Sequence, residues 1–84
     1  MKPQNILEEL EKFLNTLGIE LEKAVGTVKG GYCRIRENSV IVINRKIPVE
    51  EQLTIIANTI HRNELDYSQL RPPVREFIER FKGL

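Results

Sequence analysis

Three features that could do chemistry lie close together in KGGYCRIR, residues 29–36. The glycine pair could cradle a phosphate, Cys33 could act as a nucleophile, and Arg34 and Arg36 could bind an anion. The glycines match neither the GxGxxG pattern nor a Walker loop, and no helix follows them to offer a phosphate-binding N-terminus. We therefore predict that they shape the entry to a strand or form a bulge.

Cys33 is the only cysteine in the chain. In a strand it shares a face with Ile35, because alternate residues point the same way, so we predict a small core residue. A nucleophilic pair of Cys33 with His61, the only histidine, would need spatial adjacency and an orienting group. Activity dependent on Cys33 is therefore the less favoured alternative, and we predict no catalytic residue.

The opposite face of the same strand carries a tyrosine and two arginines, and two more basic residues follow in the segment 44–46. A tyrosine anchor with arginine hydrogen-bonding forks is typical of protein-binding surfaces. The alternative is pairing with glutamates of the same chain, at alternate positions in residues 19–22. We call this candidate binding surface the basic row: Tyr32, Arg34, Arg36, Arg45 and Lys46.

The hydrophobic pattern predicts the elements that position these residues. Apolar side chains recur at helical spacing in two long segments, and a period of two or a β-branched run marks three short ones. The order α-β-β-β-α-α predicts a single α+β domain, residues 1–84, with a small antiparallel sheet packed on helices in two layers. The expected elements are a helix over 4–17, strands at 19–22, 32–36 and 40–43, a helix over 48–62 and a last helix from Pro72.

Ile55 falls on the side of the 48–62 helix opposite its apolar stripe. Because a chain of 84 residues is near the small end for a self-sufficient core, homodimerisation through Ile55 or a free strand edge is an alternative that the sequence leaves open.

The composition, with 40% hydrophobic and 30% charged residues, fits a folded domain rather than a disordered tail. A single cysteine fits a reducing cytosol, and no apolar run is long enough to span a membrane, so we expect a cytoplasmic protein without a membrane partner. The net charge of +1 argues against a strong polyanion binder, although residues 27–47 hold five basic residues and one acidic residue.

The segment VIVINRKIPVEEQLTIIANTIH resembles the region around the active-site helix of ImmA/IrrE-like zinc metallopeptidases. That resemblance implies a His-Glu-x-x-His motif on the helix. This chain has Asn58 at the position of the first histidine, Thr59 at that of the glutamate and Arg62 at that of the second histidine. His61 stands one position before the place of the second histidine. Zinc peptidase chemistry needs two imidazoles one helical turn apart and a general-base carboxylate. We therefore expect no metal and no cofactor.

GGYCRIR, VIVINRKIPVEEQL and the terminal RPPVREFIE together resemble a group of short uncharacterised bacterial proteins, which implies no particular activity. The sequence thus predicts a non-enzymatic protein-interaction module with an unidentified protein partner. One alternative is a degenerate metallopeptidase-like domain that binds peptide without cleavage. The other, less favoured because only one aromatic residue is interleaved, is a weak nucleic-acid binder that uses the arginine-bearing sheet face.

Overall fold

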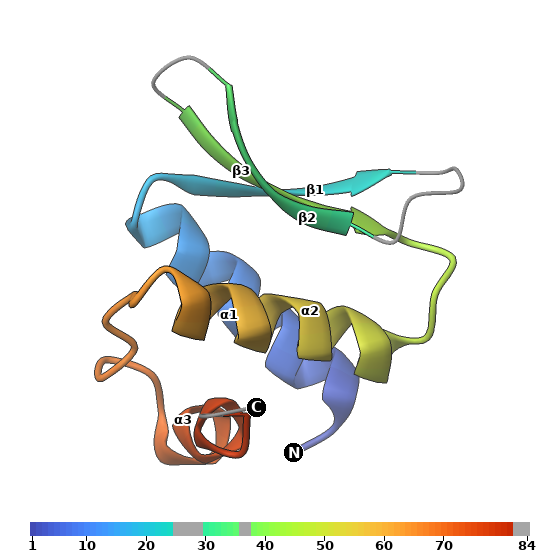
Figure 1. The fold of residues 1–84 in the computed structure, drawn as a ribbon. Helices are drawn as coiled ribbons and strands as arrows, with labels where there is room; N and C mark the ends of the chain where they lie inside the picture. The colour runs from blue at the N-terminus through green and yellow to red at the C-terminus, as the bar shows by residue number, and fades with distance from the viewer. Residues whose placement is uncertain (25–29, 36–37, 82–84) are drawn as a thin grey trace.

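The structure, a computed structural model, describes the backbone of residues 1–24, 30–35 and 38–81, and side chains in 1–24 and 39–81. It contains three helices and three strands in the predicted order, which confirms a small compact α+β domain (Figure 1). The last strand begins at Asn38, two residues before the strand expected at 40–43. The elements are α1 (Pro3–Thr16), β1 (Ile19–Ala24), β2 (Gly30–Ile35), β3 (Asn38–Asn44), α2 (Val49–Arg62) and α3 (Pro72–Glu79).

Helix α1 forms where the sequence places apolar residues on one face and begins with a proline at its first turn. It ends before Gly18, whose φ of +76° is a conformation that glycine adopts without steric cost. The turn at Gly18 sends the chain directly into β1. The buried face of α1 consists of Ile6, Leu7, Leu10, Phe13 and Leu14.

The sheet is mixed, with the strand order β1-β3-β2. Strands β2 and β3 pair antiparallel, as predicted, with Ile35 opposite Asn38. The expectation of an antiparallel sheet is wrong for β1, which pairs parallel with β3, Ile19 opposite Ser39 and Ala24 opposite Asn44. The β-branched run of β3 takes the centre because it is the strand best suited to neighbours on both edges.

The two faces of β3 have different surroundings. Ile41 and Ile43 are fully buried in the core that the helices form under the sheet. Val40 and Val42 alternate with them and therefore point to the other face, which no described helix covers (Figure 1). The sheet thus packs on helices through one face only, within the part of the chain that the structure describes.

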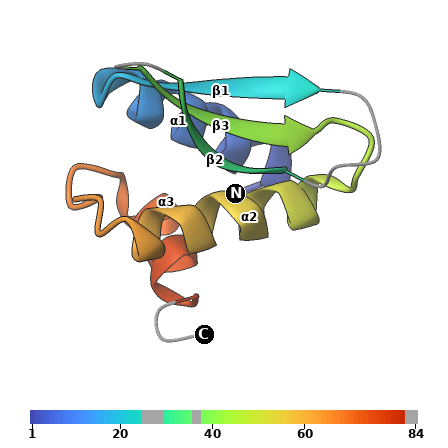
Figure 2. The ribbon, with the colours of Figure 1, turned by 45° about the horizontal axis from the view of Figure 1, so that its top comes forward.

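The elements form three layers, not the expected two. Helices α1 and α2 lie side by side under the sheet, and α3 lies on their far side (Figures 1 and 2). Because α2 is in the middle layer, its apolar surface extends beyond one stripe: Ile55 is half-buried and packs against the core cluster. Ile55, which the sequence suggested as a contact with a second copy of the chain, thus packs at least in part inside its own chain.

Candidate interaction site

Strand β1 lies at one edge of the sheet. It pairs with β3 along one side, and no other described strand pairs with its second side. Helix α1 packs beneath β1, whereas α2 packs beneath β2 and β3. An edge strand of this kind offers unpaired backbone N–H and C=O groups to another chain.

One backbone hydrogen bond shows which groups of β1 face β3 and which face the open edge. The backbone N–H of Arg45, directly after β3, donates to the carbonyl of Ala24 at 3.0 Å. The carbonyl of Ala24 therefore points toward β3, and by alternation so do the backbone groups of Glu20 and Glu22. The N–H and C=O groups of Leu21 and Lys23 consequently point to the open edge.

The side chains of β1 alternate in the other direction, between the two faces of the sheet. Leu21 is half-buried and packs against the core cluster, on the same face as Ile19. Glu20 and Glu22 are exposed on the face that carries Val40 and Val42. The outer face of this edge is therefore acidic.

A hollow of about 350 Å³ lies between α1 and β1 along the open edge. Three carboxylates surround it, and none of them forms an ion pair with a described residue. The backbone edge, the hollow and the carboxylates make this the candidate site, which we call the acidic edge. The residues that line the hollow are Glu11, Asn15, Glu20, Leu21 and Glu22.

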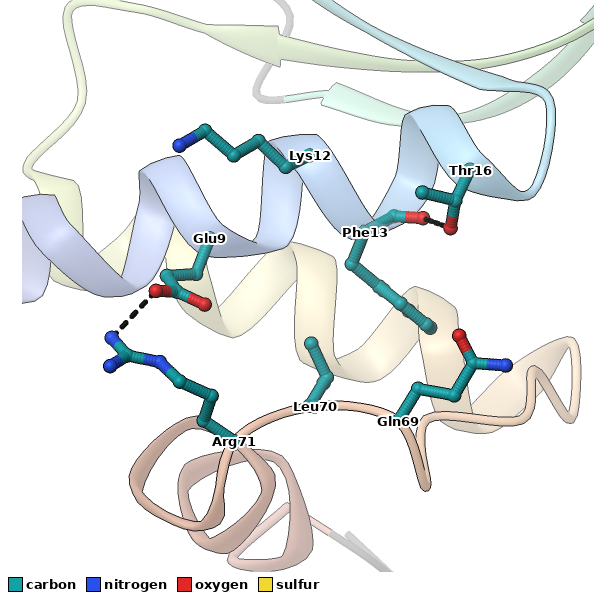
Figure 3. Close-up of a pocket in the computed structure, with 7 residues that line it drawn as sticks. All are labelled: Glu9, Lys12, Phe13, Thr16, Gln69, Leu70 and Arg71. Atoms are coloured by element: carbon teal, nitrogen blue, oxygen red, sulfur yellow. Dashed lines mark hydrogen bonds and ion pairs between the residues drawn. The ribbon is translucent and has the colours of Figure 1, made fainter.

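A second cavity, of about 210 Å³, lies between α1 and the segment that precedes α3 (Figure 3). Phe13 and Leu70 are the buried residues of its lining, and Glu9 and Arg71 form an ion pair across one end with an N–O distance of 2.6 Å. The hydroxyl of Thr16 donates to the carbonyl of Phe13 at 2.6 Å. The pair of Glu9 with Arg71 thus joins the segment before α3 to α1 beside this cavity.

His61 holds the end of α2 to α3. Its Nε2 lies 2.7 Å from the carbonyl oxygen of Ile78, so Nε2 carries the hydrogen in this contact. Its ring meets Tyr67 edge to face, with centroids 5.6 Å apart. The phenol of Tyr67 donates to the carboxylate of Glu79 at 2.7 Å, and this hydrogen bond, with smaller contributions from desolvation and the carboxylate charge, raises the pKa of Tyr67. His61 is thus half-buried and structurally engaged.

The resemblance to metallopeptidases would place metal chemistry at three positions of α2, which are Asn58, Thr59 and Arg62. Thr59 is buried, and its hydroxyl donates to the carbonyl of Ile55 at 2.8 Å. Asn58 is half-buried and Arg62 is exposed. In the described part of the chain, no three His, Cys, Asp or Glu side chains are arranged to hold a metal ion.

The basic row falls largely outside the described side chains. Arg36 lies in a segment whose structure is not described, and only the backbone is described for Tyr32 and Arg34, which stand opposite Ile41 and Ser39 of β3. Cys33 stands opposite Val40. Arg45 and Lys46 are exposed in the turn after β3, where the N–H of Lys46 donates to Oδ1 of Asn44 at 2.9 Å.

From the sequence, Glu20 and Glu22 of the acidic edge were considered only as pairing partners for the basic row. Glu20 and Glu22 alternate with Ile19 and Leu21, which marks one polar face of a strand. What the pattern does not contain is the position of that strand in the sheet. Because β3 lies between β1 and β2, Glu20 and Glu22 are not on a strand adjacent to Arg34.

Comparison of the chain with protein-family models, with curated proteins and with solved structures found no match. No helix among the described residues is long and apolar enough to cross a membrane.

Proposed function

We propose that this chain is a non-enzymatic protein-interaction module. The observation that supports the proposal is the open edge of β1, where unpaired backbone groups adjoin a hollow bordered by three carboxylates without a described partner. Open strand edges are binding elements in many recognition domains, because backbone hydrogen bonds supply affinity and flanking side chains supply specificity.

The runner-up function, peptide binding by a metallopeptidase-like domain, differs in where the ligand would lie. That reading requires a groove between a sheet edge and the 48–62 helix, which is α2. Helix α2 packs under β2 and β3, so such a groove would be at the β2 edge, on the opposite side of the sheet from the acidic edge. The location of a bound peptide therefore separates the two proposals.

The test is to identify proteins that the tagged, purified chain captures, to purify each candidate and to measure its binding by titration calorimetry. A stoichiometric complex with a micromolar or lower Kd supports an interaction module. The matched variants are Glu20→Lys with Glu22→Lys at the acidic edge and Arg34→Ala with Arg36→Ala in the basic row. If no purified candidate binds the wild-type chain stoichiometrically, the proposed function is wrong.

A further inference from the structure

We infer that the acidic edge binds an extended, basic segment of a partner protein, which adds to the sheet as a fourth strand beside β1. This inference rests on the proposed function and specifies the partner chemistry and the binding mode. Three observations support it: the direction of the free backbone groups, the charge on each side of the edge, and the poor fit of a second copy.

The backbone groups set the register of the added strand. Only Leu21 and Lys23, among the central residues of β1, direct their N–H and C=O groups to the open edge, as the bond from Arg45 to Ala24 requires. An extended segment can pair with these groups without disturbing the β1–β3 ladder, whose groups belong to Glu20 and Glu22. The free edge is thus ready for strand addition in the folded state.

The side chains set the chemistry of the added strand. On the outer face its residues would stand beside Glu20 and Glu22, where basic side chains form favourable cross-strand pairs. On the helix-facing side its residues would lie beside Leu21 and above Glu11 and Asn15 of the hollow. This arrangement favours basic residues at alternate positions with apolar residues between them, whichever direction the added strand runs.

A second copy of the chain fits this edge less well. If two β1 strands paired with each other, each would bring Glu20 and Glu22 to the same outer face, and like charges opposite one another destabilise a sheet. The acidic edge therefore disfavours symmetric dimerisation through β1 and favours a foreign segment of opposite charge.

The experiment uses the complete chain and two capped peptides of the same 6-residue length as β1, one alternating Lys and Val and the other alternating Glu and Val. We expect the Lys-Val peptide to bind and the Glu-Val peptide not to bind, as measured by fluorescence anisotropy of labelled peptide. Changing Glu20 and Glu22 to Gln should weaken binding about tenfold, since each opposite-charge cross-strand pair contributes about threefold and the two factors multiply. Added salt should weaken binding in the same direction.

Backbone pairing has its own readout. On addition of the Lys-Val peptide, the amide hydrogens of Leu21 and Lys23 should become protected from exchange, whereas those of Glu20 and Glu22 should be protected already. Lys23→Pro removes one free-edge N–H and should abolish binding, while Lys23→Ala, which keeps that N–H, should bind as the wild type does. Because the exchange measurement uses the wild-type chain, it decides the matter even if Lys23→Pro fails to fold.

Several results would overturn the inference. They are equal binding of the two peptides, no binding of the Lys-Val peptide at millimolar concentration, unchanged protection of Leu21 and Lys23, and self-association of the chain that Lys23→Pro abolishes. Protection confined to α2 and β2 would instead support the metallopeptidase-like reading. If a purified partner protein binds the wild type and Lys23→Pro equally, the inference falls while the proposed interaction function stands.

Discussion

Helices α1 and α2 are covered on one side by the sheet and on the other by α3 and the segment that precedes it. The two sides differ in whether their polar groups are paired. On the α3 side, Arg71 is paired with Glu9, Tyr67 with Glu79, and His61 with the carbonyl of Ile78. On the sheet side, the carboxylates around the β1 edge have no ion-pair partner in the described part of the chain. Polar groups that the fold has already paired hold the chain together, and those that it leaves unpaired are available to a partner.

The largest expected effect concerns the apolar contact between the sheet and the helices. Ile41→Ala should lower the free energy of unfolding by about 3–4 kcal/mol, because it leaves a cavity in a fully buried site. Val42→Ala, one position away on the uncovered face, should cost less than about 1 kcal/mol. Urea unfolding followed by circular dichroism measures both, and equal losses would mean that the outer face of β3 is packed as tightly as the inner one.

The second prediction compares the side of β1 that pairs with β3 and the open side of the same strand. Glu22→Pro removes an N–H that points to β3 and should cost about 2–3 kcal/mol, since the paired carbonyl is left without its donor. Lys23→Pro removes an N–H at the open edge and should cost less than about 1 kcal/mol. Thermal unfolding of the two variants measures the difference, and the opposite ranking would show that the assignment of the free edge is wrong.

A smaller effect is expected on the α3 side. His61→Phe keeps an aromatic ring against Tyr67 but leaves the carbonyl of Ile78 without its donor, so it should cost about 1–2 kcal/mol. Arg71→Ala should cost less than about 1 kcal/mol, because its side chain is 62% exposed and solvent screens the pair with Glu9. Chemical denaturation compares the two. If Arg71→Ala were the more damaging change, the cavity beside α1 would matter more than the His61 contact.

The smallest effect is one of pH. The hydrogen bond to Glu79 raises the pKa of Tyr67 above its ordinary value of 10.0, so the stability from this contact is complete below about pH 10 and is lost as the pH rises through the raised pKa. Glu79→Gln should return the pKa of Tyr67 toward its ordinary value. Ultraviolet titration of tyrosinate in a Tyr32→Phe background isolates Tyr67, and an unchanged titration would show that Glu79 does not control it.

The sequence predicted the elements better than their arrangement. The helical stripe of α1 and the antiparallel pairing of β2 with β3 depend on residues close in the chain, and these were confirmed. The parallel pairing of β1 with β3 depends on residues about 20 positions apart, and no local pattern selects that partner. Ile55 looked unpartnered because a single stripe was expected for a helix that in fact lies between two layers.

The acidic edge shows the same limit. The alternation of Glu20 and Glu22 with Ile19 and Leu21 predicts a strand with one polar face. Whether that strand lies at the centre or the edge of the sheet decides whether its backbone can bind a partner, and that depends on β3. The side chains of Tyr32, Cys33, Arg34 and Arg36 lie outside the described residues, so the predictions made for them stand as predictions.

The strand order also governs when the sheet can form during synthesis. Strands β1 and β2 both emerge from the ribosome before β3, yet they are not neighbours in the folded sheet, and each takes β3 as its partner. A nascent chain that ends before residue 38 therefore contains two strands with no native pairing available to either. We expect both strand pairs to form in one step once the segment that includes Asn38–Asn44 has left the ribosome. The release of β3 therefore determines when the sheet folds during translation.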